Sequence, residues 1–290
     1  MIERTELALG NAGVLTPGRW RWARALGWMA VMLAVLIFVL SWQGIVRKLV
    51  GDAPALLLFT AFASLFGAYA AYYALVRFGE RRAVTELAPA AIPLDLGTGF
   101  LIGLGMFTLV FASQRLLGAC TMAPGHWTDW GHDLRETIGT GLIEELLVRL
   151  VVFRLLMRAA GTWPALILSA LIFGGAHLAN PHASLLAAVA IAIEAGLMLA
   201  AFYLLTGRIW MSVGVHAAWN FAQGAIFGAR VSGQEGSGSL FVSGPAPGAS
   251  DLLSGGAFGP EASLPAIVVG LAIFGVVIAA AQRRQSAASR

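Results

Sequence analysis

The sequence is poor in charged residues and in cysteine. Only 12% of the 290 residues are charged, and Cys120 is the only cysteine. A single cysteine excludes an internal disulfide and any metal site built on several thiolates. Soluble domains are about 25% charged. The scarcity of charge, together with 58% hydrophobic residues and a mean hydropathy of +0.79, predicts an integral membrane protein.

The chain also lacks the basic, aromatic-rich surface that nucleic-acid-binding proteins use. Its pI is near 9.8, but no arginine-rich face with interleaved aromatic residues appears. We expect the arginines instead to orient membrane helices, because positive residues stay on the cytoplasmic side. Placing both termini in the cytoplasm puts thirteen of the nineteen Lys and Arg residues inside and five outside. The expected partner is therefore the lipid bilayer of a bacterial-type cell membrane, which the chain crosses several times.

Long apolar runs predict an all-α fold with about eight transmembrane helices in a single membrane domain, 26–281. An N-terminal cytoplasmic segment, 1–25, precedes this domain and a C-terminal tail, 282–290, follows it. The Gly-, Ser- and Pro-rich stretch 231–260 is expected to be a mobile, exposed loop. The helices are expected at 26–45, 54–76, 97–120, 136–157, 164–178, 184–205, 209–227 and 264–281.

Two adjacent glutamates and an arginine lie inside the fourth predicted helix, where ionisable groups are costly. Glu145 and Arg149 are four residues apart, so they share a helical face and can pair. Glu144 lies about 100° around the helix, with no cation at the fourth residue after it. We therefore expect Glu144 to be the carboxylate that is free for chemistry and Glu145 to be a support.

Later predicted helices carry further polar residues at helical spacing. His216 and Asn220 are four apart on one helix, and Phe173 and His177 are four apart on another. Glu194 lies outside these pairs, and we expect a supporting contact for it, with Arg208 or with a backbone group, rather than a place in the same cavity.

Two chemistries suit this set of residues, and the spacing favours neither. Glu144 and His177 can deprotonate a water while His216 and Asn220 stabilise the oxyanion of an amide under attack. Alternatively, Glu144, His177 and His216 can hold a catalytic zinc ion with an open fourth position. A third interpretation is structural: the same residues form a buried polar network that only holds the helices together.

Three short motifs follow one another in the core segment 136–228. Glu144-Glu145-Leu146-Leu147-Val148-Arg149 fits EExxxR, Phe173-Gly174-Gly175-Ala176-His177 fits FxxxH, and His216-Ala217-Ala218-Trp219-Asn220 fits HxxxN. In this order and spacing, the segment resembles the CPBP family (CAAX protease and bacteriocin-processing, or Abi), intramembrane proteases related to type II CAAX prenyl proteases. Outside about 136–221 the resemblance extends only to the presence of membrane helices.

The resemblance implies hydrolysis of a peptide bond in a membrane-embedded or lipid-modified substrate. Glu144 and His177 match the family's water-activating pair, and His216 and Asn220 match its oxyanion-stabilising positions. Glu145, Arg149 and Phe173 then support them. The family is often described as metalloproteases, so the zinc alternative stays open. The competing hypotheses are a non-catalytic scaffold or immunity protein of the same family and, with no support beyond the intramembrane acids, a proton-relaying transporter.

Overall fold

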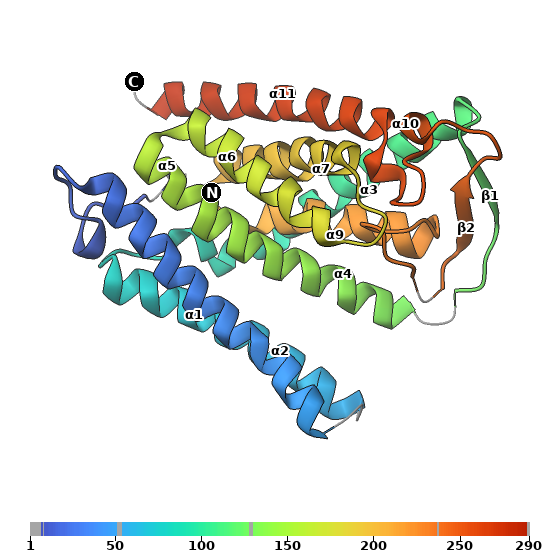
Figure 1. The fold of residues 1–290 in the computed structure, drawn as a ribbon. Helices are drawn as coiled ribbons and strands as arrows, with labels where there is room; N and C mark the ends of the chain where they lie inside the picture. The colour runs from blue at the N-terminus through green and yellow to red at the C-terminus, as the bar shows by residue number, and fades with distance from the viewer. Residues whose placement is uncertain (1–6, 8, 51–53, 128–129, 237, 289–290) are drawn as a thin grey trace.

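The computed structural model describes residues 7, 9–50, 54–127, 130–236 and 238–288. It is an assembly of long helices with one two-stranded sheet at its edge, which confirms the predicted all-α membrane fold (Figure 1). The helices are α1 (Arg21–Val50), α2 (Pro54–Ala74), α3 (Ile92–Leu116), α4 (Trp130–Glu145), α5 (Arg154–Ala160), α6 (Thr162–Ala176), α7 (Leu185–Ile191), α8 (Met198–Thr206), α9 (Trp210–Phe221), α10 (Asp251–Ser254) and α11 (Leu264–Ala288).

Several of these helices are continued by π-helical segments. Segment η2 (Leu75–Gly79) extends α2, η5 (Leu146–Phe153) joins α4 to α5, η7 (Ala192–Leu197) joins α7 to α8, and η8 (Ala222–Ile226) extends α9. Short 3-10 turns are η1 (Gly13–Leu15), η3 (Thr85–Leu87), η4 (Pro89–Ala91), η6 (His177–Ala179) and η9 (Pro260–Ala262). Single-turn π segments often accompany functional sites. Here η5 begins directly after Glu145 and η7 contains Glu194.

The predicted membrane segments are helical, except that α3 ends at Leu116, so the predicted end of the third segment at 120 is wrong. Among the described residues, six helices are long and apolar enough to span a bilayer. These six are Arg21–Val46, Leu58–Gly79, Thr85–Leu116, Thr162–Ala179, Leu185–Thr206 and Leu264–Arg284. The predicted segment 136–157 differs because it carries five charged residues. The predicted segment 209–227 differs because it is short: α9 provides 12 helical residues and η8 adds only 5. The two helices with the most catalytic candidates are thus the least typical membrane spans.

Helix α9 is held tightly against α3 by glycines. A Cβ atom at Gly103 would lie 2.2 Å from the carbonyl oxygen of Val215, and one at Gly99 would lie 2.4 Å from that of Met211. Such backbone approach is possible only for glycine, and it is a common way to pack helices in lipid. It fixes the position of α9 one residue away from His216. Helix α4 packs on another side of α9, so the first and third motifs face each other.

The sequence led us to expect an exposed loop at 231–260, but the structure has regular elements there. Strand β2 (Phe241–Pro245) pairs antiparallel with β1 (Cys120–Pro124), and α10 follows it. Phe258 and Ser254 are buried, so the expectation of exposure is wrong for them. In Figure 1 this sheet and α10 lie at the end of the molecule away from the C-terminus. The mobility predicted for the segment stays a prediction.

A buried charge network ties α1, α2 and α5 together at another place in the fold. The guanidinium of Arg154 donates two hydrogen bonds to Glu80, at 2.7 and 2.8 Å, and both side chains are fully buried. Arg82 bridges Glu80 to Glu86 at 2.8 and 2.7 Å, and the indole nitrogen of Trp28 also donates to Glu80. Because these groups satisfy one another, the network can be buried without unpaired charge.

We predict that Arg154→Met destabilises the fold by about 3–5 kcal/mol, because it leaves the buried Glu80 carboxylate undercompensated. The measurement is the free energy of unfolding in detergent. Glu235→Gln is the control, since the Arg230–Glu235 pair is exposed and should contribute little. Equal stability of Arg154→Met and the unmodified chain would contradict the importance given to this pair.

Candidate active site

Glu145 is the most enclosed residue of the first motif, and it connects two helices. Its side chain is fully buried, with Oε1 2.9 Å from His216 Nδ1 and Oε2 3.1 Å from Arg149 Nε. Because a carboxylate only accepts hydrogen bonds, Nδ1 of His216 carries a proton and donates it to Glu145. The pairing of Glu145 with Arg149, predicted from their spacing, is present. The bond to His216 is an addition that only the folded chain provides.

Arg149 is held on several sides. It donates a hydrogen bond to the carbonyl oxygen of Ala195 in η7, and its guanidinium carbon lies 5.0 Å from the centre of the Phe173 ring. A cation over an aromatic face is stabilised by the ring's quadrupole, more so when it is desolvated. Arg149 therefore joins η5 to α6 and η7, and Phe173 has the supporting place expected of it.

Glu144 differs from its neighbour as the helix geometry predicted. Its side chain is 30% exposed to solvent, and its Oε2 lies 3.8 Å from Nε2 of His216. This distance exceeds a hydrogen bond, so the carboxylate is near the imidazole without being bound to it. Two adjacent glutamates thus contact the two nitrogens of one histidine, Glu145 by a hydrogen bond and Glu144 at longer range.

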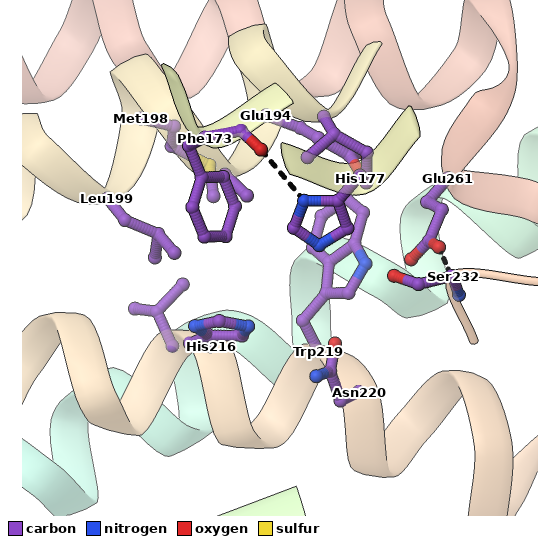
Figure 2. A pocket seen from close by; sticks show the side chains of 13 residues that line it. Phe173, His177, Glu194, Met198, Leu199, His216, Trp219, Asn220, Ser232 and Glu261 are labelled. Carbon is purple, nitrogen blue, oxygen red and sulfur yellow. Dashed lines mark hydrogen bonds between the residues drawn. The ribbon is translucent and has the colours of Figure 1, made fainter. Parts of the chain in front are cut away.

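A cavity of about 30 Å³ lies beside His216, and Figure 2 shows the side chains around it. A cavity needs at least about 10–15 Å³ to hold a water, so this one has room for a bound water. Phe173, His177, His216 and Asn220 all line it, so α6 and α9 bring four of the predicted residues together. Glu144 is not part of this lining but stands next to it through its contact with His216.

The orientation of His177 follows from its own helix. Its Nδ1 lies 2.8 Å from the carbonyl oxygen of Phe173, one turn earlier (Figure 2). A carbonyl oxygen only accepts, so Nδ1 is the protonated nitrogen in this contact. Nε2 of neutral His177 is then a base that can accept a hydrogen bond from a water. The sequence placed His177 on a helix, and the structure puts it where α6 passes into the 3-10 turn η6.

Two acidic residues, Glu194 and Glu261, line the cavity although the sequence did not predict it. Glu194 was expected to contact Arg208 or the backbone, but it lines the cavity, and its Oε2 has no hydrogen-bond partner in the described part of the chain. Arg208 instead forms an ion pair with Asp95 at 2.6 Å. Glu261 was not singled out at all. It comes from η9, and no signal in the Gly- and Ser-rich sequence before it indicates that it returns to the motif helices.

Glu261 is held by the segment that follows the third motif. The backbone N–H of Ser232 donates a hydrogen bond to its Oε1, and both residues line the cavity (Figure 2). Burial raises the pKa of Glu261 to about 7, and the hydrogen bonds from Ser232 and the nearby His216 charge offset only part of this effect. Glu261 therefore changes charge near neutral pH.

The predicted zinc set can be tested on this geometry. Within the described residues, no group of three His, Cys, Asp or Glu side chains is arranged to hold a metal ion. His177 and His216 line the same cavity, but Glu144 does not converge with them on one point. The zinc site stays a prediction, and the mechanism proposed for this chain uses its own side chains alone.

The two adjacent glutamates should differ sharply in their effect on stability. We predict that Glu145→Gln lowers the free energy of unfolding by about 3–5 kcal/mol, because it leaves the buried Arg149 charge unpaired. Glu144→Gln should change it by at most about 0.5 kcal/mol, as is usual for a partly exposed side chain without bound partners. Chemical unfolding of both variants in detergent measures the contrast. Similar values for the two would contradict the different roles assigned here.

Glu261 should make stability depend on pH. Between its ordinary pKa of 4.5 and about 7, the folded chain keeps a proton that the unfolded chain releases. The free energy of unfolding should therefore fall as pH rises through this window, by on the order of 3 kcal/mol in total. Glu261→Gln should remove this part of the slope, whereas Glu235→Gln should keep it. An unchanged slope in Glu261→Gln would overturn the prediction.

Comparisons with known proteins address the family. Residues 127–222 match the family model described as "Type II CAAX prenyl endopeptidase Rce1-like", a range that includes all three motifs. Searches of curated proteins and of solved structures found no match to the chain. The matched range coincides with the helices that surround the cavity and confirms the resemblance drawn from the motifs. Over this segment, the chain is similar to the Rce1-like type II CAAX prenyl endopeptidase family.

Proposed function

We propose that this protein is an intramembrane endopeptidase that hydrolyses a peptide bond of a membrane-associated or lipid-modified substrate. The observation that carries the proposal is the water-sized cavity lined by His177, His216 and Asn220. It lies among helices apolar enough to span a bilayer. A peptidase needs a bound water, a base and donors for an oxyanion, and each has a candidate here.

The first half of the reaction is activation of the water. In the proposed mechanism Nε2 of His177 accepts a hydrogen bond from the water, because its Nδ1 is engaged with the Phe173 carbonyl. Glu144, the partly exposed carboxylate, takes a proton from that water. The water oxygen forms a bond to the carbonyl carbon of the substrate, and the π electrons of the carbonyl move to its oxygen.

The second half is stabilisation and collapse of the tetrahedral intermediate. The side-chain amide of Asn220 donates a hydrogen bond to the oxyanion, and Nε2 of His216 donates another when its ring is doubly protonated. Glu145 favours that singly charged imidazolium form, since it accepts the hydrogen bond from Nδ1 at 2.9 Å. As the C–N bond breaks, Glu144 returns its proton to the leaving nitrogen, which restores the carboxylate.

A non-catalytic scaffold is the alternative function, and one observation favours it. Glu145, Arg149 and His216, with the carbonyl of Ala195, join α4, η5, η7 and α9 whether or not any peptide is cleaved. A protein that uses the network only for packing would keep these contacts. The water-sized cavity and the unpaired Glu194 oxygen have no purpose in such a scaffold, so we prefer the peptidase.

We predict that Glu144→Gln reduces peptide cleavage by about 10²- to 10⁴-fold, the usual contribution of a general base. The assay is mass-spectrometric detection of products from a randomised peptide library, some of it lipid-modified, with protein purified in detergent. Asp251→Asn is the matched control, because that carboxylate is exposed and does not line the cavity.

Each result of this assay has a definite meaning. Cleavage by the unmodified protein that Glu144→Gln loses while remaining folded supports the proposal. A folded protein that cleaves no member of the library favours the scaffold. Loss of activity with a chelator and its return with zinc would replace the metal-free mechanism by the zinc alternative.

A further inference from the structure

A second, larger cavity lies next to the catalytic one. Its volume is about 550 Å³, within the range of ligand-binding pockets. It is enclosed by the end of α3, by β1 and β2, and by the stretches that precede and follow β2, at the end of the molecule where Figure 1 shows the two strands. We call it the strand-side cavity.

Small residues line most of the strand-side cavity, so its walls are largely backbone. Seven lining residues are glycines: Gly224, Gly228, Gly236, Gly238, Gly244, Gly256 and Gly259. Without side chains at these positions, peptide groups of the wall are within reach of a bound molecule. Polypeptides are recognised in this way, through hydrogen bonds to an accessible main chain.

Two buried polar atoms at this cavity, Gln114 Oε1 and Ser243 Oγ, have no hydrogen-bond partner among the residues that the structure describes. Gln114 is fully buried, and its amide nitrogen donates to the carbonyl oxygens of Leu253 and Ser254, at 3.0 and 3.1 Å. Its carbonyl oxygen Oε1 is left without a hydrogen bond, and so is the hydroxyl of Ser243. A buried acceptor without a donor is costly. Both groups are suited to donors that a ligand brings, such as amide N–H groups.

The charges of the cavity indicate a neutral ligand. Its charged lining residues are Arg230 and Glu235, which pair with each other at 2.6 Å. Arg230 also donates to the carbonyl oxygen of Ala257. No lining charge is left uncompensated to attract a phosphate or a cation, and apolar atoms of Phe111, Val242 and Pro260 complete the wall. A neutral, amide-bearing chain suits this combination best.

Only a thin partition separates the two cavities. Arg230 and Pro260 line the strand-side cavity. Ser232, two residues after Arg230, and Glu261, directly after Pro260, line the catalytic cavity. The two stretches touch through their backbones, since a Cβ at Gly259 would lie 2.3 Å from the Arg230 carbonyl oxygen. A polypeptide held in one cavity is therefore only one layer of backbone away from the reacting atoms in the other.

We propose that the strand-side cavity binds an uncharged, extended stretch of the substrate polypeptide that adjoins the scissile bond. This inference rests on the proposed peptidase function, because the adjoining site gives the bound peptide its purpose. The cavity then selects substrates by small or neutral residues in that stretch, and Gln114 and Ser243 fix the position of the chain by accepting its N–H groups.

Gly244→Leu tests this by filling the cavity. Gly244 lies in β2 and lines the cavity, and a Cβ there meets no atom within 4 Å, so the larger residue has room. We predict that KM for a peptide cleaved in the library assay rises about tenfold while kcat stays within about twofold, because lost ground-state binding appears in KM. Gly105→Leu in α3 is the matched control, since a Cβ there also meets no atom within 4 Å, and it should change neither constant. An unchanged KM in Gly244→Leu would overturn the proposal.

A second measurement needs no catalysis and no cavity variant. Cys120, the only thiol of the chain, lines the cavity and can report on its occupancy. In the Glu144→Gln protein, we expect an acetylated and amidated hexapeptide library to slow modification of Cys120 by N-ethylmaleimide about tenfold, as for a site that is about 90% occupied. Inorganic phosphate at the same concentration should leave the rate unchanged.

The two measurements separate the cavity from the catalysis. An unprotected Cys120 in a protein that does cleave peptides would overturn the cavity proposal and leave the peptidase intact. Protection in a protein that cleaves nothing would support peptide binding at the strand-side cavity while the hydrolysis proposal fails. Protection by phosphate alone would replace the peptide with an anionic ligand and overturn the inference.

Discussion

The buried carboxylate of Glu145 is the interaction on which the site depends. One oxygen faces Arg149 and the other accepts a hydrogen bond from His216. A charge can remain in an apolar bundle only when it is paired and hydrogen-bonded. Satisfying Glu145 therefore requires α4, η5 and α9 to meet in one arrangement. The same requirement orients the imidazole of His216, so that the packing of the helices and the geometry of the cavity have one origin.

Close backbone packing supplies the second constraint. Gly99 and Gly103 let α9 approach α3 until carbonyl oxygens occupy the space of side chains, which sets the depth of His216 and Asn220. Phe173 then contacts Arg149 from α6 and places His177 on the far side of the cavity. Helices α6 and α9, together with the segment from α7 to α8, thus bring the motif residues around one cavity.

The segment after the third motif extends the site beyond the motif helices. It returns Ser232 and Glu261 to the cavity beside His216 and, with β1 and β2, surrounds a second cavity large enough for a short peptide. A charged pair such as Glu80–Arg154 uses burial to join helices, whereas Oε2 of the buried Glu194 has no hydrogen-bond partner among the described residues. Buried acids of that second kind are costly, and cost without structural benefit is typical of functional sites.

The sequence by itself determined the membrane class, the helical segments and the difference between the paired Glu145 and the unpaired face of Glu144, because apolar length and four-residue spacing are local properties of a helix. Its three motifs also indicated the family that residues 127–222 resemble. It also placed Phe173 with His177 and His216 with Asn220. Only the tertiary structure decided that Glu145 bonds His216, that Glu194 lines the cavity while Arg208 pairs with Asp95, and that Glu261 reaches the site. Such contacts join residues tens of positions apart, so no periodicity in the sequence predicts them. They follow from the packing of whole helices and from the path of a Gly-rich segment, whose composition indicates only a loop.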